Sequence, residues 1–535
     1  RNENNHNKRL RRIVNKSGAI MLEVMRLEKK IEKLTLPVWR GELYFERHRG
    51  TLTSIAKNKR NNRRAEFAAM NAEWLCEESA LLCGAEYPKA LFDGAWKKIL
   101  NMQFHDILPG SCIGAVYEET DALYAEVFAE LGRAAEAAAA EIGACLPAGY
   151  MAAVVNPNGF RTDAYVHTGE GCRLVRGPPP KSIVPLCAEP VRGSVSVSER
   201  ALENTFVSVR FAPDYTIASV FDKRCGRELL RPGRRANVLQ AFDNHAVYEF
   251  DAWELKTYFD KKGWEIDDVS EVKLLDDGAR KGVYIRRRYL SSEVRQTVWL
   301  YEESPRIEFE TQADWREPHT IVKALFPVDI NAEYVTRDIA FGRCDTPVHA
   351  KMPWDQERFE ICAHKYCDLR EGDYGVALLS DCKYGYDFRD GMRLTLFKTA
   401  SFPFPEADIG RHDFTYALFP HGSDPLYTQV LREATLLNNP PYLQKVIGKG
   451  ARGAFDPAAG FVSCNGGNVV LETVKCAENG ELCAGPRVRL RQLPHAYIAG
   501  ICLAVGRGME VRPSRTAGMR TEMPGERGRT GTCAL

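Results

Sequence analysis

The stretch at 134–159, AAEAAAAEIGACLPAGYMAAVVNPNG, marks where the chain changes from helix to strand. The alanine run closes a long segment with helical spacing, and Leu146-Pro147 ends it. Beyond this point, short segments rich in Val, Tyr, Phe and Thr alternate with turn signals such as Asn-Pro-Asn-Gly at 156–159. The sequence therefore predicts an α+β protein, with a helical bundle followed by a large antiparallel β-sandwich region.

Four helices are predicted before this boundary. Ser17 caps the first, in which apolar residues recur every three or four positions until Pro37 stops it. The others are expected at about 57–83, 91–104 and 113–145. The residues expected in the bundle core are Phe67, Met70, Trp74, Leu81, Trp96, Leu100, Val116, Leu123, Val127 and Leu131.

The β region is expected to contain strands at 208–222 and 293–312 and a hairpin across Asp390-Gly391. A helix or linker at 425–441 separates it from a final β segment that starts near Tyr442. The resulting domains are 1–146 (helical), 147–435 (β-sandwich), 436–483 (closing β segment) and 484–535 (an atypical tail). The tail has nine Arg, three Glu and neither Lys nor Asp. A disordered or frame-shifted end is favoured over a basic binding tail, and we assign the tail no function.

Composition excludes several classes of function. Lys and Arg total 73 against 71 Asp and Glu, so a net charge of +2 argues against nucleic-acid or membrane-surface binding. No apolar run is long enough to span a membrane, and the polar start lacks a secretory signal. The 16 cysteines are scattered without a Cys-x-x-Cys pair, which favours a reducing cytoplasm over a disulfide framework.

Two segments could carry chemistry. In Gln-Phe-His-Asp-Ile-Leu-Pro-Gly-Ser at 103–111, His105 and Asp106 stand between two helices before a tight turn, where imidazole suits zinc and a carboxylate suits a metal or sugar hydroxyls. On spacing alone, a helix-terminal His with an Asp cap is the favoured explanation of the segment. The polar segment at 41–54 suits a polyhydroxylated ligand or an ordinary solvated loop. The acid- and histidine-containing stretches at 381–391 and 405–421 are typical of hairpin loops.

Taken together, these segments resemble glycoside hydrolase family 38, the α-mannosidases, in the branch with cytosolic and bacterial enzymes. The matching stretches, in the family's order, are 41–67, 103–119, 154–163, 326–330, 354–364, 374–398 and 405–421. The resemblance implies a three-helix bundle and a large β region, with the family's N-terminal barrel absent from this chain. It implies that His105 is one of four ligands of a single Zn²⁺, or of Co²⁺ as the alternative ion. It also implies that Asp106, His48 and Arg49 bind the sugar.

The resemblance further implies that the nucleophile and the acid/base carboxylate of a retaining glycosidase lie upstream, so no catalytic residue is assigned here. The leading hypothesis is an α-mannosidase fragment, inactive by itself, that acts on terminal α-linked mannose of oligosaccharides in the cytoplasm. The alternative is a non-catalytic carbohydrate-binding or scaffold protein. Linkage preference and homo-oligomer formation are left open.

Overall fold

The computed structural model describes residues 26, 30, 35, 44, 46–244, 250–350, 352–424, 428–450, 460–462, 469–477, 482–488 and 501–502. The contacts divide the chain into two units, Arg1–Phe45 and Glu46–Leu535. The first predicted helix lies outside the described residues, except for Arg26 and Lys30, which are helical and exposed.

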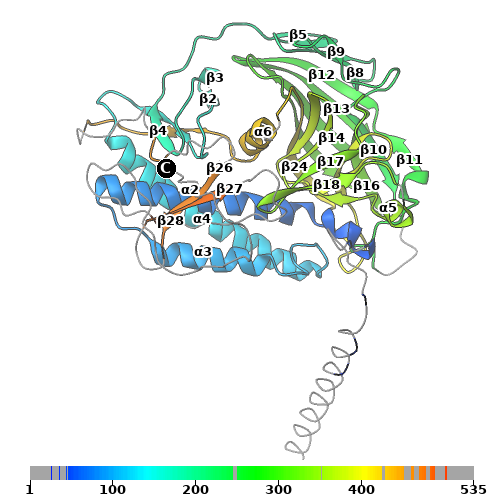
Figure 1. The fold of residues 1–535 in the computed structure, drawn as a ribbon, viewed down its shortest axis with the longest axis horizontal. Helices are drawn as coiled ribbons and strands as arrows, with labels where there is room; N and C mark the ends of the chain where they lie inside the picture. The colour runs from blue at the N-terminus through cyan, green and yellow to red at the C-terminus, as the bar shows by residue number, and fades with distance from the viewer. Residues whose placement is uncertain are drawn as a thin grey trace, which may run out of the picture. The chain divides into compact units, whose positions relative to one another are not determined.

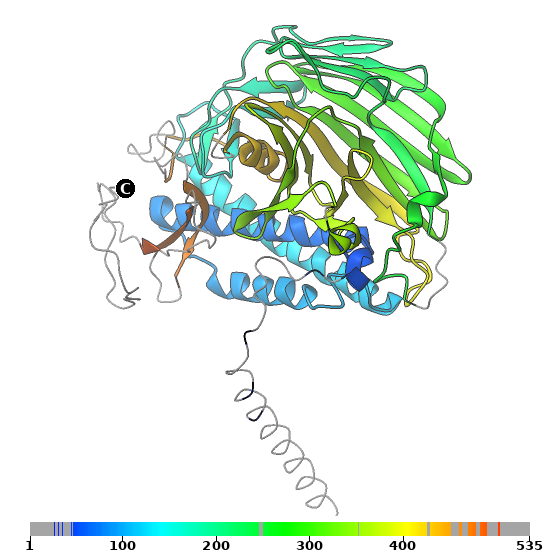
Figure 2. The same cartoon turned by 45° about the vertical axis from the view of Figure 1, so that its right-hand side comes forward.

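Three long helices lie side by side within Glu46–Leu535 (Figures 1 and 2). They are α2 (Ala56–Cys83), α3 (Lys89–Met102) and α4 (Gly114–Ala144), which confirms the helices expected at 57–83, 91–104 and 113–145. Trp74, Val127 and Leu131 are buried in the bundle core, as predicted.

Two other core predictions were wrong, because Leu81 is 41% and Leu100 59% exposed. Helix α3 buries Phe92, Ala95, Ile99 and Met102 at spacings of three and four. Leu100 follows Ile99 by one residue, which rotates its side chain by about 100° away from that face.

The β region contains three principal sheets that are antiparallel throughout. The nine-stranded sheet has the order β12 (Asp268–Asp277), β13 (Arg280–Tyr289), β14 (Ser292–Tyr301), β15 (Ile307–Trp315), β24 (Gly410–His421), β21 (Tyr374–Ser380), β20 (Tyr366–Glu371), β17 (Tyr334–Ile339) and β18 (Gly342–Pro347). The six-stranded sheet has the order β11 (Gly263–Glu265), β10 (Val238–Asp243), β16 (Thr320–Phe326), β23 (Met392–Lys398), β22 (Gly385–Asp387) and β19 (Ile361–Cys362). The five-stranded sheet has the order β5 (Ser196–Ser198), β6 (Ala201–Glu203), β7 (Val207–Phe211), β8 (Ile217–Asp222) and β9 (Arg227–Glu228).

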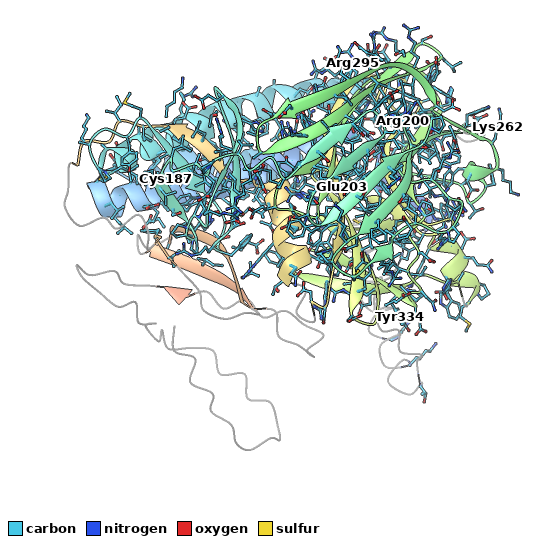
Figure 3. The ribbon with its side chains drawn as sticks, turned by 90° about the horizontal axis from the view of Figure 1, so that it is seen from above. Cys187, Arg200, Glu203, Lys262, Arg295 and Tyr334 are labelled. Atoms are coloured by element: carbon cyan, nitrogen blue, oxygen red, sulfur yellow. The ribbon has the colours of Figure 1, made fainter. Side chains whose placement is uncertain are left out.

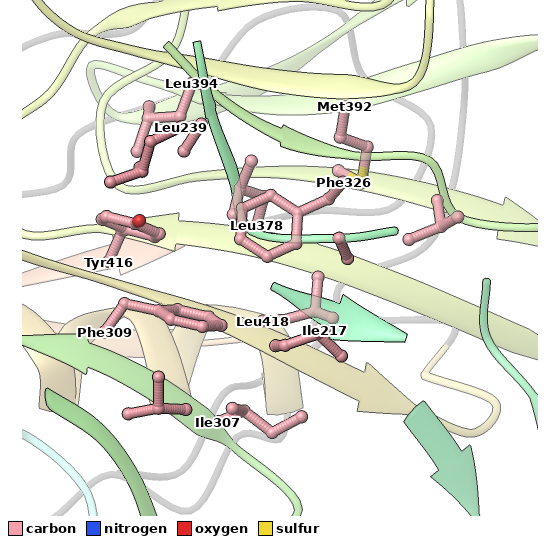
Figure 4. Packing of buried hydrophobic residues seen from close by; sticks show 14 of the residues in the cluster. Ile217, Leu239, Ile307, Phe309, Phe326, Leu378, Met392, Leu394, Tyr416 and Leu418 are labelled. Carbon is pink, nitrogen blue, oxygen red and sulfur yellow. The ribbon is translucent and has the colours of Figure 1, made fainter. Parts of the chain in front are cut away.

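One hydrophobic core joins these sheets. Phe309 and Leu418 from the nine-stranded sheet pack in the same cluster as Phe326 and Leu394 from the six-stranded sheet and Ile217 from the five-stranded sheet (Figure 4). The alternation of apolar residues along each strand places one face of each sheet in this core. The predicted α+β architecture, a helical bundle followed by a large antiparallel β region, is therefore confirmed.

The strands predicted at 208–222 and 293–312 are present as the pairs β7–β8 and β14–β15, and the predicted hairpin across Asp390-Gly391 is the pair β22–β23. The helix expected at 425–441 is α6 (Thr428–Asn438), which packs on the nine-stranded sheet through Val430 and Leu431. The described helices include none with the length and apolar character required to cross a membrane.

Smaller sheets complete the described chain. They are β25 (Tyr442–Lys445) with β1 (Ala152–Asn156) and β4 (Ser182–Pro185), the pair β2 (Ala164–Thr168) and β3 (Gly171–Val175), and β26 (Val469–Cys476) with β27 (Leu482–Val488) and β28 (Ile501–Cys502). Short helical segments are η1 (Glu46–Leu52), η2 (Phe259–Lys261) and α5 (Pro353–Glu357). The prediction for the 484–535 tail lies largely outside the described residues. The predicted domain boundaries stay predictions.

Candidate functional site

His105 and Asp106 lie in the turn that follows α3, which ends at Met102. The side chain of His105 is 78% exposed and that of Asp106 43% exposed, with His105 Nε2 3.6 Å from Asp106 Oδ2. The hydroxyl of Ser111 donates to Asp106 Oδ1 at 2.9 Å, and the Ser111 N–H donates to the Asp106 carbonyl at 3.0 Å. The carboxylate is therefore oriented by Ser111 while the imidazole is open to a ligand.

Helix α2 holds this turn in place. Asn58 Nδ2 donates to the carbonyl of Ile107 at 2.9 Å, and Lys59 Nζ donates to the carbonyls of Leu108 and Pro109 at 3.0 and 3.2 Å. Because these donors come from the first turns of a long helix, the His105 turn has a rigid support.

The turn also contacts the end of the 41–54 segment. Lys59 Nζ donates to the carbonyl of Ser54 at 2.5 Å, so one ammonium group joins the two segments. Gly110 has a φ of +90°, and a Cβ at this position would collide with the Ser54 carbonyl. A glycine is therefore required for this close approach.

The two predicted sugar-binding residues of η1 have different surroundings. His48 is exposed, and its backbone departs from helical geometry (φ −121°, ψ 18°). Arg49 is buried, and its guanidinium donates to the Glu357 carbonyl at 2.7 and 3.0 Å, pairs with the Glu357 carboxylate at 2.5 Å and covers the Phe359 ring at 4.4 Å. These contacts give Arg49 an anchoring role, and direct sugar binding stays a prediction for Arg49, His48 and Asp106 alike.

Asp408, Lys59 and Lys398 are buried charged residues near the start of α2, and the sequence analysis did not identify them. Asp408 accepts the backbone N–H groups of Ile55 and Ala56 at the start of α2, both at 2.7 Å. Burial raises the pKa of Asp408 and lowers the pKa of Lys59. It also lowers the pKa of Lys398, which donates to the Asp251 carbonyl, to about 8. The sequence pointed to one of these residues only, because Asp408 lies within the family-like stretch at 405–421.

Two histidines of that stretch are buried in β24. His412 Nε2 lies 2.8 Å from the Asp408 carbonyl, and burial lowers the pKa of His412 to about 3. His421 Nε2 lies 2.9 Å from Asp368 Oδ1. Both side chains are enclosed within the fold, so neither is offered to a ligand at the surface.

The chemistry of His105 and its neighbours fits the metal prediction in part. The exposed imidazole of His105 has the donor chemistry that zinc takes. Within the residues that the structure describes, however, no three His, Cys, Asp or Glu side chains converge as a metal site requires. His105 and Asp106 offer two donors at most, which falls short of four ligands. The ligand role of His105 stays a prediction.

Comparison with known proteins identifies similar domains. Residues 46–142 match the alpha mannosidase middle domain, and residues 202–406 match the glycosyl hydrolases family 38 C-terminal domain. Alpha-mannosidase 2C1 of Homo sapiens is 31% identical over 500 residues, which cover 88% of this chain and 47% of that protein. Alpha-mannosidase G of Dictyostelium discoideum is 27% identical and covers 83% of this chain and 47% of that protein. The chain thus spans about half the length of these curated relatives.

Solved structures share the fold. An alpha-mannosidase from Enterococcus faecalis V583 superposes with a TM-score of 0.71 at 14% identity, over 86% of this chain and 66% of that one. A glycosyl hydrolase family 38 protein from the same species gives a TM-score of 0.68 at 15% identity, over 86% and 67%. At these identities the likeness concerns the fold alone.

Proposed function

Because the chain belongs to glycoside hydrolase family 38, we propose that it is the middle and C-terminal part of an α-mannosidase that releases terminal α-linked mannose from oligosaccharides by a metal-dependent retaining mechanism. In this proposal the His105 turn is one wall of the active site, and a further domain supplies the nucleophile and the acid/base carboxylate. In retaining glycosidases two such carboxyl groups about 5 Å apart allow a covalent glycosyl intermediate.

The surroundings of His105 are the observation that carries the proposal. Leu100, Phe104 and Ile113 flank the turn and are 59%, 53% and 58% exposed. Exposed apolar side chains around a polar pair are typical of a surface that another domain covers. The polar pair would then lie at the interface, where a substrate could reach groups from both domains.

The residues of this chain have distinct roles in the proposal. His105 would hold zinc, or cobalt as the alternative ion, together with ligands from the further domain. Asp106, kept in orientation by Ser111, would accept hydrogen bonds from sugar hydroxyls, and His48 would approach the same sugar. We include a cytoplasmic location, which rests on the scattered cysteines without a Cys-x-x-Cys pair.

An activity assay with an aryl α-mannoside tests the proposal. The chain alone should give no turnover, whereas the chain fused behind a family 38 barrel should be active. In that fusion, His105→Ala should lower kcat/KM by at least about 100-fold, since a lost ligand weakens metal binding. Thermal stability should not change, because the imidazole is 78% exposed.

Metal analysis gives an independent readout. After dialysis the chain alone should keep no stoichiometric zinc, because water would have to replace the missing ligands. Turnover by the chain alone, or tight zinc that survives His105→Ala, would contradict the assignment. A fusion that binds saccharide but never turns over would favour the non-catalytic alternative.

A further inference from the structure

An open cavity of about 490 Å³ lies in the β region, on a part of the chain that the proposed site does not use. The residues that line it include Asp243, Trp264, Tyr289, Leu290, Glu317 and His319. They come from the ends of β10 and β13, from β11, and from the connection between β15 and β16. The volume falls within the range of about 300–1,000 Å³ that small-molecule sites occupy.

Two aromatic side chains line this cavity. Trp264 is 49% exposed on β11. Tyr289 stacks on the buried Trp315 with ring centroids 5.4 Å apart and planes 10° apart, and Trp315 Nε1 donates to the Glu317 carbonyl at 3.0 Å. The Tyr289 ring is therefore fixed before any ligand arrives, which lowers the entropy cost of binding.

Two carboxylates accompany the aromatic rings. Glu317 Oε1 accepts the Ser291 N–H at 2.8 Å and the Ser292 hydroxyl at 3.0 Å, which leaves Oε2 as the oxygen for a ligand hydroxyl. Asp243 pairs with Lys262 at 2.5 Å. Burial, followed by the negative charges of Glu317 and Asp243, raises the pKa of Tyr289. The phenol is therefore within electrostatic reach of both acids.

The backbone has a positive φ at two positions around the cavity. Leu290 (φ +50°) belongs to the two-residue turn that joins β13 to β14, where this geometry is usual, whereas His319 (φ +51°) lies in the connection between β15 and β16, where it disfavours residues other than glycine. Leu290 is also 81% exposed, although apolar side chains gain stability by burial. A residue held in this region outside a hairpin turn, as His319 is, occurs preferentially at binding sites.

We propose that this cavity binds one hexose unit of a neutral saccharide. The apolar C–H face of a pyranose ring would pack on Trp264, beside the fixed Tyr289 ring, and its hydroxyls would donate to Glu317 Oε2 and Asp243. A cationic ligand fits less well, because Lys262 already neutralises Asp243. The saccharide class follows from the cavity itself, and only the choice of mannose as its sugar rests on the proposed function.

Native affinity electrophoresis of the full chain in gels with yeast mannan tests this inference. Mannan should retard the wild-type chain, and Trp264→Ala should weaken this retardation at least ten-fold. Tyr334→Ala is the matched control, because Tyr334 is 48% exposed and lies well away from Lys262, the neighbour of Trp264 (Figure 3). Tyr334→Ala should migrate as the wild type does.

A second variant, Glu317→Gln, tests the cavity with a substitution that is not expected to affect folding. Glu317→Gln keeps an oxygen that can accept the Ser291 N–H, and it should weaken retardation at least three-fold without a change in melting temperature. Equal retardation of Trp264→Ala and wild type, or displacement by choline but not by free mannose, would overturn the inference. An absence of retardation by mannan, and by glucan in a parallel gel, would overturn it too. Binding is measured without turnover, so an inactive fusion that still binds mannan refutes the proposed catalytic function alone.

Discussion

Asp408 Oδ1 accepts a hydrogen bond from the backbone N–H of Ala56 at 2.7 Å, although 352 residues separate the two positions. Asp408 Oδ2 accepts the neighbouring N–H of Ile55 at the same distance. Ile55 is in the left-handed region (φ 54°), where a β-branched residue is strained. A carboxylate from the β region therefore caps the helix that supports the His105 turn.

Asp408→Ala should destabilise the protein by about 2–3 kcal/mol, because two backbone N–H groups lose a charged acceptor in a buried place. Chemical denaturation at pH 7 measures this loss. Glu406→Ala, an exposed neighbour, is the control and should change the unfolding free energy by less than about 0.5 kcal/mol. Equal stability of the two variants would show that the cap contributes nothing.

Lys59→Met should loosen the His105 turn. The substitution keeps most of the apolar stem but removes the donor to Ser54, Leu108 and Pro109. We expect a loss of about 1.5–3 kcal/mol and faster amide exchange at 107–111. Lys57→Met is the matched control, since Lys57 pairs with Asp121 at the exposed surface. Unchanged exchange in the turn would contradict the supporting role of Lys59.

His412 should make the protein sensitive to acid. Its pKa is about 3 in the folded chain and about 6.5 when unfolded, so the unfolded state takes up a proton first as the pH falls. The stability that neutral His412 contributes is present above pH 6.5 and is lost between pH 6.5 and about 3. From pH 7 to pH 5 this amounts to about 2 kcal/mol.

Urea denaturation at several pH values checks this prediction. His412→Gln should flatten the pH dependence in that window. A His412→Gln slope equal to that of the wild type would refute the assignment.

The sequence predicts local structure well because the decisive contacts are local. The spacing of Trp74, Val127 and Leu131 identifies the buried helix faces, and the Asp390-Gly391 turn identifies the β22–β23 hairpin. The exposed positions of Leu81 and Leu100 could not be predicted, since periodicity cannot show which of two apolar flanks meets a neighbour.

The site was predictable only in part, because some of its contacts join residues that are far apart in the sequence. Family-like motifs identified His105 and Asp106, and the structure places both in the exposed turn after α3. The cap by Asp408 and the anchoring of Arg49 by Glu357 join positions more than 300 residues apart. No local pattern encodes such a pairing, so only the folded chain reveals it.

Glu78→Gln should stabilise the protein at neutral pH. Glu78 is fully buried on α2, and neither carboxylate oxygen has a hydrogen-bond partner in the part of the chain that the structure describes. Burial raises the pKa of Glu78 well above its ordinary value, which favours the protonated carboxyl in the folded state. Stability is then lost as the pH rises above about 4.5, because the Glu78 carboxyl ionises more readily in the unfolded chain than in the folded one.

The gain from Glu78→Gln should therefore be small at pH 4.5 and reach about 1–3 kcal/mol at pH 8. Denaturation at both pH values measures the difference. Glu136→Gln on the exposed side of α4 is the control and should show no such trend. A gain that does not grow with pH would mean that Glu78 is charged in the folded protein.

Substitutions of His48 and Arg49 should have different effects on stability, because His48 is exposed and Arg49 is buried. Arg49→Lys removes the fork that engages Glu357, and a lysine cannot reproduce its geometry. It should cost about 2 kcal/mol in unfolding free energy. His48→Ala should change stability by less than about 0.5 kcal/mol, since His48 is exposed.

Activity of the barrel fusion provides the other half of the test. His48→Ala should raise KM for the aryl α-mannoside with an unchanged melting temperature, whereas Arg49→Lys should lower the melting temperature with KM nearly unchanged. The reverse pattern would place Arg49 at the sugar and make His48 irrelevant to it. If both variants lowered stability alone, η1 would serve only to join the helices to the β region, and Asp106 would be left as the sole sugar contact proposed for this chain.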